Sequence, residues 1–437
     1  MISKPKGTTD IIGSDAKIWK YVEKVIDSFM EKYNYNYART PIFENSELFH
    51  RGIGDTTDIV TKETYDFKDR GDRNLTLRPE GTAGIVRSFI ENKLYATSSL
   101  PVKLYYNGTM YRYERPQKGR YRELSQYGVE VLGSFDPMID AEVISLAYNI
   151  NKALGLTDTV IHINSLGDNE SRANYREALK AHFKPHLDDL CDDCKNRYEK
   201  NPLRLLDCKV DSNKDYFKDA PSIIDYLNEE SKDNFDKVIS YLDILKVNYV
   251  IDDKVVRGLD YYNHIVFELM TEDNNLALGG GGRYDHLVDQ LDGPKTPCVG
   301  YAVGLDRLVE VLKSRDFIHL DDAVEIFIMY VNDEEKSYAI YLSNELRTAG
   351  FKVETEYIKP SLKSEFKRAD HFNSKYLIIL NSTDLNEGVV TIKNNKTKEE
   401  EKIMLEYLIY YFDEHLADEL EEDECCNHHE EEESHHE

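Results

Sequence analysis

Two segments of the chain combine strand-like patterning with polar side chains that suit a small ligand. Apolar and polar residues alternate over Val102–Glu114 and Gln126–Leu132, and the loop between them contains proline and glycine. This pattern predicts an antiparallel hairpin with a long loop. Because side chains two residues apart on a strand share a face, one face of the hairpin carries Arg112, Glu114, Gln126, Gly128 and Glu130.

That face leaves room for a ligand, because Gly128 has no side chain between Gln126 and Glu130. The hairpin loop adds cations that can hold a polyphosphate through charge-assisted hydrogen bonds. These cations are Arg115, Lys118, Arg120 and Arg122. On this pattern alone, a solvated strand face with an ordinary charged loop is the alternative.

Two further segments contain residue types that suit an amino-acid or nucleotide site. An apolar strand is predicted for Val255–Leu269, and it contains the segment Arg257–Tyr262. In this segment a glycine beside the arginine permits close backbone approach, and two tyrosines offer hydroxyl groups. In Gly300–Leu308, small residues before an arginine let the backbone pack against a flat ligand such as adenine. A salt-bridged strand arginine and a helix packed on a sheet are the alternative explanations.

The glycine run Gly279–Gly282 resembles a phosphate-binding loop. It lacks the Lys-Ser/Thr pair of a P-loop and the spacing of a dinucleotide-binding loop. We therefore interpret it as a strand end at which backbones come close together.

Three of the six cysteines lie near one another, as Cys191-x-x-Cys194 with Cys208 fourteen residues later. This spacing is compatible with zinc, but a tetrahedral structural site needs a fourth ligand. His182 and His186 are near in sequence and fit no recognised spacing. A zinc site and three reduced thiols both stay open, and no residue is assigned as a metal ligand.

The elements that must position these residues predict an α+β fold. Ser14 and Asp15 are candidate caps of a helix whose apolar residues recur at Ile18, Val22, Val25, Phe29 and Tyr33. A first domain spans 1–321 and includes a charged, mostly helical insertion at about 168–250. Strands (325–331, 352–357, 375–380) alternate with helices (334–349, 362–372), which predicts a separate α/β domain over 322–414. The acidic segment 415–437 is predicted not to fold.

Composition limits the class of protein. No apolar run is long enough to span a bilayer, and the N-terminus has no secretory signal pattern, so we expect a protein of the reducing cytoplasm without a membrane partner. The net charge of -27 is unusual for a nucleic-acid binder. Of the 82 acidic residues, 13 lie in 413–437, which leaves 69 against 55 basic residues before that segment. A local basic surface therefore stays compatible with the composition.

Together these segments resemble the histidyl-tRNA synthetases, a family of class II aminoacyl-tRNA synthetases, over nearly the whole chain to about residue 412. The three class motifs correspond to Tyr37–Glu44, Met110–Arg122 and Gly304–Leu308. The histidine-specific signatures correspond to Arg257–Tyr262 and Gly281–Asp285, and the amino-acid loop to Leu77–Thr82. The resemblance implies a class II synthetase-like antiparallel sheet flanked by helices and a C-terminal α/β anticodon-binding domain. It also implies a homodimer that uses L-histidine, ATP, Mg²⁺ and tRNA(His).

The resemblance further implies a role for individual residues. The implied catalytic residues are Arg112, which bridges the ATP α-phosphate and the histidine carboxylate, and Arg257, which stabilises charge at the α-phosphate. ATP is also contacted by Glu114, Arg120, Arg307 and Leu124, the last replacing the aromatic residue that the family usually has. The α-amino group is bound by Glu80, Thr82 and Gln126. The imidazole is bound by Glu130 and Tyr262 in a pocket lined by Tyr261 and Tyr284.

The main alternative is a non-catalytic relative, the regulatory subunit of ATP phosphoribosyltransferase, which senses histidine on the same fold. Such proteins generally lack the catalytic arginines and the C-terminal domain. Here Arg112, Arg257 and Arg307 are present and an α/β domain follows. A synthetase-like domain of a translation kinase is excluded because the chain has no kinase signature.

Overall fold

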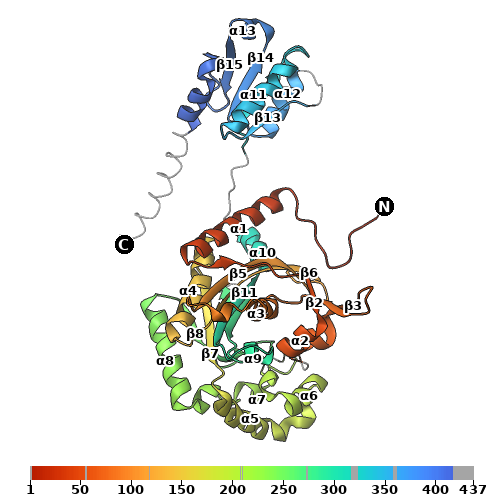
Figure 1. Cartoon of the computed structure of the whole chain (residues 1–437), viewed down its shortest axis with the longest axis vertical. Coiled ribbons are helices and arrows are strands. Elements are labelled where there is room, and N and C mark those ends of the chain that lie inside the picture. Colours follow the sequence, from red (N-terminus) through yellow and green to blue (C-terminus); the bar gives the residue numbers. More distant parts are fainter. Residues whose placement is uncertain are drawn as a thin grey trace. The chain divides into compact units, whose positions relative to one another are not determined.

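The computed structural model describes residues 2–54, 57–117, 119–206, 208, 210–271, 274–315, 323–357 and 362–416. The chain divides into two compact units, Met1–His319 and Leu320–Glu437, and we describe each by itself (Figure 1). The predicted acidic segment 415–437 lies outside the described residues from 417 onward.

An eight-stranded sheet organises the described part of the first unit, in the order β1-β5-β6-β11-β10-β9-β7-β8. Its strands are β1 (Asn36–Tyr37), β5 (Val102–Tyr111), β6 (Glu123–Leu132), β7 (Thr159–Ser165), β8 (Tyr249–Ile251), β9 (Asn263–Thr271), β10 (Asn274–Arg283) and β11 (Cys298–Gly304). The inner strands pair antiparallel, and β1 and β8 join the two edges in parallel. The predicted antiparallel sheet is confirmed.

The two faces of this sheet differ in what covers them. One face packs against α1 (Ser14–Lys32), α4 (Pro137–Ala153), α8 (Glu229–Ile244) and α10 (Leu305–Arg315), in a core that includes Tyr127, Val129 and Val131 of β6. The other face packs against α3 (Thr82–Glu91), α9 (Leu287–Gln290) and the helices that follow β7. Because side chains alternate along β6, Gln126, Gly128 and Glu130 belong to this second face.

One group of short elements in the first unit lies before β5. They are α2 (Ser46–Ile53), η1 (Ile59–Glu63), η2 (Leu94–Ala96) and a small sheet, ordered β2-β4-β3, made of β2 (Phe43–Asn45), β3 (Tyr65–Lys68) and β4 (Asn74–Leu77). The loop after β4 leads directly into α3.

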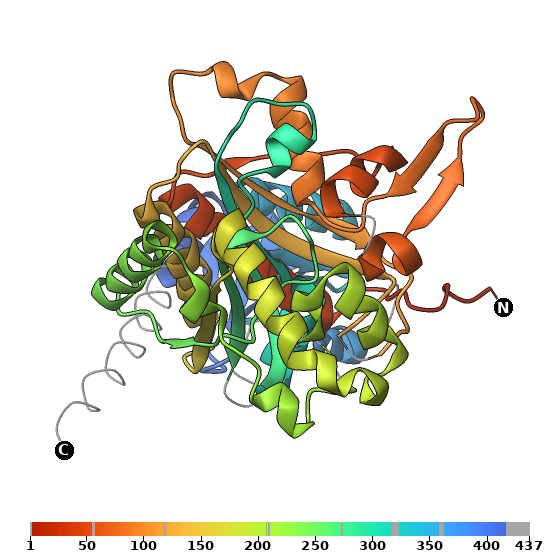
Figure 2. The same ribbon diagram turned by 90° about the horizontal axis from the view of Figure 1, so that it is seen from below.

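The helical segment between β7 and β8 has two parts. The first part contains α5 (Asn169–Phe183), η3 (Lys184–Asp189), α6 (Asp192–Lys200), η4 (Pro202–Leu205), α7 (Asp215–Lys218) and η5 (Ile223–Tyr226), drawn in yellow to green in Figure 2. Its buried side chains join the core of the second sheet face. The second part, α8, packs with α4 in the core of the opposite face. The segment predicted as one insertion therefore serves both faces.

Two predicted strands are shorter than their patterns suggested. The predicted strand Val102–Glu114 ends at Tyr111, and the predicted strand Val255–Leu269 begins only at Asn263. The pairing of β9 with β10 stops at Asn263 opposite Arg283, so no neighbouring strand is available to the residues before it. Gly258 does not mark a close backbone approach, because a Cβ there would meet nothing within 4 Å.

The first helix also differs in detail from its prediction. It begins at Ser14 after Gly13, and no side chain caps it, so the predicted Ser14 and Asp15 cap is wrong. Its buried residues are Trp19, Val22, Ile26 and Met30. Among the predicted apolar residues, Ile18, Val25, Phe29 and Tyr33 lie only partly buried at the edge of the core. The buried face of the helix is therefore rotated relative to the predicted one, because its position depends on the neighbouring helices as well as on the helix period.

The second unit is built as a smaller sheet with helices. Its elements are β12 (Ile326–Tyr330), α11 (Lys336–Thr348), β13 (Val353–Thr355), α12 (Leu362–His371), β14 (Tyr376–Leu380), α13 (Ser382–Asn386), β15 (Val389–Asn394), β16 (Glu400–Met404) and η6 (Leu405–Tyr407). The sheet order is β13-β12-β14-β15-β16, with the first three strands parallel and the last two antiparallel. The predicted alternation over 325–380 matches these elements, whereas β15 and β16 were not predicted. None of the described helices in either unit is long and apolar enough to cross a membrane.

A buried ion pair joins the main sheet to α4 and gives a test of the fold. Arg283 at the end of β10 and Asp140 in α4 are both fully buried, with Nη2 and Oδ2 2.8 Å apart. Replacing Asp140 leaves the buried Arg283 charge with Asp285 as its remaining partner, 3.2 Å away, so Asp140→Ala should lower the free energy of unfolding by about 3 kcal/mol. The single tryptophan, Trp19, lies in this unit, and its fluorescence during urea titration measures the change.

Asp233→Ala, which breaks an exposed ion pair with Lys237 on α8, is the matched control and should change the unfolding midpoint little. Equal effects of the two substitutions would show that the buried pair does not support the fold.

Candidate functional site

A cleft of about 510 Å³ opens on the second face of the main sheet. Its walls come from the β5–β6 hairpin, the loops before α3 and β9, strand β10 and the first residues of α10. The predicted site residues that line it are Glu80, Thr82, Arg112, Glu114, Arg120, Leu124, Gln126, Arg257, Tyr261, Tyr262 and Arg307. The predicted residues Glu130 and Tyr284 do not line the cleft and lie directly behind Thr82, as the following contacts describe.

Glu130 lies behind the cleft and is buried, with 1% of its surface exposed. Its Oε1 accepts a hydrogen bond from the Thr82 hydroxyl at 2.6 Å, and its Oε2 accepts one from the Tyr284 hydroxyl. Burial raises the pKa of Glu130 to about 8. The carboxyl group is therefore largely neutral at pH 7.

The backbone next to Glu130 is kept free of side chains. Gly300 of β11 pairs with Glu130 across the sheet, and a Cβ at that position would lie 2.0 Å from Glu130 Oε2. A Cβ on Gly128 would lie 2.4 Å from Tyr106 Oη. Glycine is required at both positions because the carboxyl and phenol groups occupy the space that a Cβ would take.

The end of the cleft nearest α3 offers hydrogen-bond acceptors. Glu80 precedes this helix and accepts hydrogen bonds from the backbone N–H groups of Thr82 at 2.7 Å and Ala83 at 2.8 Å. Burial raises the pKa of Glu80 above its ordinary value. The Oε1 atom of Gln126 is buried and has no hydrogen-bond partner among the described residues. An acceptor without a partner is available to a ligand that donates hydrogen bonds.

Three tyrosines form an aromatic wall beside these acceptors. The ring centroids of Tyr261 and Tyr262 are 4.6 Å apart, and those of Tyr261 and Tyr284 are 5.6 Å apart. The loop before β9 carries two of these rings, and the third follows the glycine run of β10. In a strand, the adjacent residues Tyr261 and Tyr262 would point to opposite faces. The loop places both rings on one wall of the cleft.

The other end of the cleft is cationic. Arg112 follows β5 and its Nε donates to the Pro79 carbonyl at 2.8 Å, while Arg307 in α10 donates to the Ala277 carbonyl. Arg120 Nη1 lies 3.7 Å from Glu114 Oε2. Arg257 is ion-paired with Glu268 of β9, and the glycine run makes room for it, since a Cβ on Gly280 would lie 2.8 Å from Arg257 Nη1. The interpretation of this run as a place of close approach is thus supported.

Only part of the predicted cationic loop reaches the cleft. Arg120 lines it, whereas Arg115 is exposed and absent from its lining, and the guanidinium of Arg122 stacks 3.8 Å above the Tyr113 ring. Lys118 lies outside the described residues. Leu124 lines the cleft as predicted for a residue that would cover a ligand ring.

Three acidic residues of the cleft were missed by the sequence analysis: Glu63, Glu268 and Asp306. Burial raises the pKa of Glu63 above its ordinary range and that of Asp306 to about 6. Asp306 accepts a hydrogen bond from the Ser125 backbone N–H at 2.7 Å. The signal that could have found Glu268 is its position as the single acid of β9, between apolar neighbours.

Comparisons with known proteins agree with this geometry. The family model described as Histidyl-tRNA synthetase matches residues 7–308, and the one described as Anticodon binding domain matches residues 325–415. The chain is 46% identical to the histidine--tRNA ligase of Staphylococcus haemolyticus, over 93% of this chain and 98% of the relative. It is 47% identical to that of Bacillus cytotoxicus, over 93% and 97%.

Solved structures give the same result. The apo histidyl-tRNA synthetase of S. aureus matches with a TM-score of 0.80 at 40% identity, over 94% of this chain and 100% of that chain. An ATP phosphoribosyltransferase regulatory subunit/histidyl-tRNA synthetase from Bacillus halodurans C matches with a TM-score of 0.62 at 22% identity, over 87% and 98%, and shows the shared fold alone. From the matched family model and these relatives, the chain belongs to the histidyl-tRNA synthetase family.

Proposed function

We propose that this chain activates L-histidine with ATP, forming histidyl-adenylate and pyrophosphate, and then transfers histidine to the 3′-terminal adenosine of tRNA(His). The observation that carries this proposal is the composition of the cleft. One end holds buried acceptors and tyrosines, and the other end holds four arginines. The two ends suit an amino acid and a polyphosphate, which must meet for activation to occur.

The acceptor end suits histidine. Its α-ammonium group can donate to the unpartnered oxygen of Gln126 and to Glu80, with Thr82 beside them. The imidazole then lies along the tyrosine wall, with Tyr262 at one nitrogen and the other nitrogen directed toward Thr82 and the Glu130 carboxyl group behind it. A neutral carboxyl group has one O–H donor and keeps acceptor capacity, so Glu130 can pair with an imidazole nitrogen as well as with the two hydroxyl groups. Pairing both ring nitrogens distinguishes imidazole from an amide or an alkyl chain.

The cationic end suits ATP. Arg120 and Arg307 are placed to hold the phosphates, Glu114 lies beside them, and Leu124 offers an apolar surface to the adenine ring. Phosphates of ATP ordinarily bring Mg²⁺, which neutralises charge on the pyrophosphate leaving group. Glu114 and Glu268 are the residues that would hold this ion, because both line the cleft and carboxylate oxygens are ligands that Mg²⁺ prefers.

The two arginines nearest the junction are proposed to act in activation. Arg112 contacts the end of the loop that carries Glu80, which suits a guanidinium between the histidine carboxylate and the α-phosphate. Arg257 supports the α-phosphate as negative charge develops during in-line displacement of pyrophosphate. Its Nε atom has no hydrogen-bond partner among the described residues, so a donor remains for an incoming oxygen.

A histidine-sensing regulator is the competing function on the same fold. The four cleft arginines and the relatives at 46% and 47% identity favour the ligase. The chain is proposed to consist of a catalytic domain, 1–321, and an anticodon-binding domain, 322–414. The second domain is proposed to bind the anticodon because the family model described as Anticodon binding domain matches residues 325–415.

A cytoplasmic homodimer is also part of the proposal. The segment that resembles the first class motif exposes Tyr37, Ile42 and Phe43 by 56%, 41% and 53%. Apolar side chains exposed together are suited to an interface with a second copy of the chain.

Removing the second unit tests the proposed division of labour. The full chain should exchange labelled pyrophosphate into ATP only when histidine is present, and a chain ending at residue 321 should retain this exchange because every cleft residue precedes that point. Charging of tRNA(His) should be lost in the shortened chain. Histidine binding without exchange by the full chain would support the regulator, and loss of exchange in a folded short chain would contradict the division.

Glu130→Ala tests the histidine pocket. The substitution removes a buried hydrogen-bond partner of the ligand and of Tyr284, so the histidine KM should rise by a factor that corresponds to about 1–3 kcal/mol. The ATP KM should change little. Steady-state exchange kinetics measure both constants, and Glu123→Ala on the exposed start of β6 is the control. A raised ATP KM with an unchanged histidine KM would refute the assignment.

Arg257 tests the proposed catalytic step. Because its contact should strengthen as charge develops, Arg257→Ala should lower kcat for adenylate formation about a hundredfold or more with near-normal KM values. Arg257→Lys should not restore the rate, because a single ammonium cannot replace the planar fork of donors. Pre-steady-state measurement of adenylate formation decides this. Activation at close to the wild-type rate would leave Arg257 with only its structural pairing to Glu268.

A further inference from the structure

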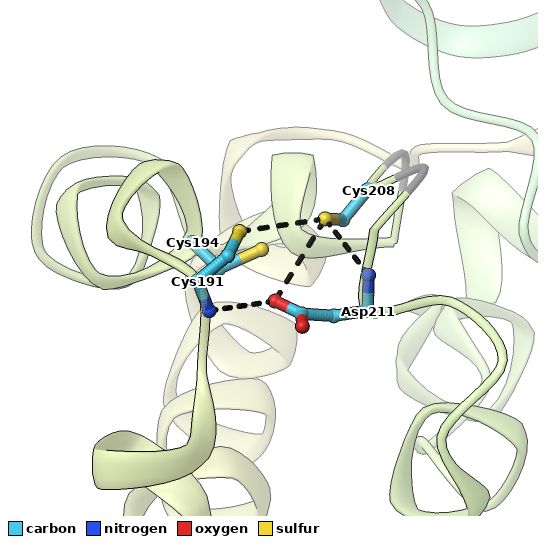
Figure 3. A group of neighbouring side chains, drawn as sticks. All are labelled: Cys191, Cys194, Cys208 and Asp211. Atoms are coloured by element: carbon cyan, nitrogen blue, oxygen red, sulfur yellow. Dashed lines mark hydrogen bonds between the residues drawn. The ribbon is translucent and has the colours of Figure 1, made fainter.

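Four potential metal ligands converge in the helical segment away from the cleft. Cys191, Cys194, Cys208 and Asp211 each offer one atom, and these atoms all lie within 4.8 Å of one another (Figure 3). All three cysteines are free thiols. Cys194, Cys208 and Asp211 are buried, and Cys191 is partly buried. Among the described residues, this is the one group of three or more His, Cys, Asp or Glu ligand atoms that lie close enough together to hold a metal ion.

Two separate parts of the chain supply these ligands. Cys191 precedes the first residue of α6 and Cys194 lies in its first turn, while Cys208 and Asp211 follow η4. One hydrogen bond joins the two parts at a ligand atom, because the N–H group of Cys191 donates to Asp211 Oδ2 at 2.9 Å. A second bond lies within the loop after η4, where the N–H group of Asp211 donates to Cys208 Sγ at 3.3 Å. Such bonds fix the orientation of ligands around a metal ion.

Two of the distances between ligand atoms match those around a tetrahedral zinc ion. With zinc–sulfur bonds of about 2.3 Å, the sulfur atoms of a regular tetrahedron are about 3.8 Å apart. Cys191 Sγ and Cys208 Sγ are 3.8 Å apart, and Cys208 Sγ and Asp211 Oδ2 are also 3.8 Å apart. A disulfide would need sulfur atoms at about 2.05 Å.

Asp211 supplies the fourth ligand that the cysteine spacing lacked. The histidines considered from the sequence are engaged elsewhere, because His182 contacts the Tyr216 carbonyl at 2.7 Å and His186 stacks on the Tyr216 ring. Asp211 Oδ1 is held 3.0 Å from Lys214 Nζ. This leaves Oδ2 toward the sulfur atoms, and the lysine offsets part of the negative charge of three thiolates and a carboxylate.

The four potential ligands lie in a segment built from short elements. Between α5 and α8 its elements are short helices of four to nine residues. Short elements supply few internal hydrogen bonds, and small units of this kind commonly depend on a metal or a disulfide. The segment also contacts the loop that carries the cleft tyrosines, since Arg172 donates to the Tyr262 carbonyl at 3.0 Å and Asn201 donates to Asp260 at 3.1 Å.

We propose that Cys191, Cys194, Cys208 and Asp211 bind one structural Zn²⁺ ion that joins α6 to the loop after η4. Thiolate-rich ligand sets favour zinc over magnesium or calcium, and four protein ligands leave no open position for catalysis. The ion holds the segment in place beside the loop that borders the cleft. This inference is independent of the reaction proposed for the cleft.

Metal content gives the first test. The full chain, produced under reducing conditions with zinc and freed of loose metal by gel filtration, should contain one more equivalent of zinc by mass spectrometry than its Cys208→Ser variant. All chains keep the same C-terminal segment, so Cys425 and Cys426 contribute equally to each. Cys298→Ser is the matched control, because Cys298 is a buried free thiol outside the cluster, and it should retain the ion. Equal zinc in the wild type and a folded Cys208→Ser chain would overturn the site.

Cobalt substitution gives a second test that does not depend on the folding of the Cys208→Ser chain. Wild-type chain refilled with Co²⁺ alone should develop a thiolate-to-cobalt charge-transfer band and the intense visible bands of tetrahedral cobalt. Asp211→Cys should increase the charge-transfer intensity by about one third, because four thiolates replace three. Asp211→Asn should weaken zinc retention against a chelator, whereas the exposed Asp215→Asn should not. A wild-type chain without the charge-transfer band would overturn the proposal.

Discussion

The burial of the Glu130 carboxyl group is the constraint on which the site depends. A carboxyl group that is removed from water must be hydrogen-bonded or neutral. Here Thr82 and Tyr284 supply hydroxyl groups and the raised pKa of about 8 supplies neutrality. Satisfying Glu130 fixes the start of α3 and the chain after β10 in place. It also requires a glycine at position 300, because the carboxyl group fills the space of a side chain on β11.

The charges of the cleft are arranged in opposing pairs. Arg257 faces Glu268, and Arg120 lies near Glu114, so the cationic end holds its guanidinium groups in defined positions within the folded chain. Oriented charges of this kind need little reorganisation when a phosphate arrives. The short contacts of Arg112 and Arg307 to backbone carbonyls serve the same end, because they fix part of each fork and leave other N–H groups for a ligand.

Much of the fold and the cleft could be predicted from local pattern. The alternation along β5 and β6 predicted their pairing and the face of Gln126, and the strand–helix alternation over 325–380 matched the second unit. The prediction was wrong where one apolar run covers both a loop and a strand. The apolar run from Val255 continued past the point where a partner strand exists, so residues up to Tyr262 form a loop. The predicted cap of α1 was also wrong, because the residue at the N-cap position is Gly13, which has no side chain to accept a hydrogen bond.

The sequence by itself determined the family, the antiparallel sheet and the set of residues that gather at one cleft. These follow from residue types at short spacing, which record the period of each element and the chemistry of each motif. Only the tertiary structure decided which acids join that cleft, that Glu130 lies behind it, and that Asp211 completes a group of three cysteines. Such contacts join residues from different elements, and their distances depend on how the elements pack, a property that spacing along the chain does not contain.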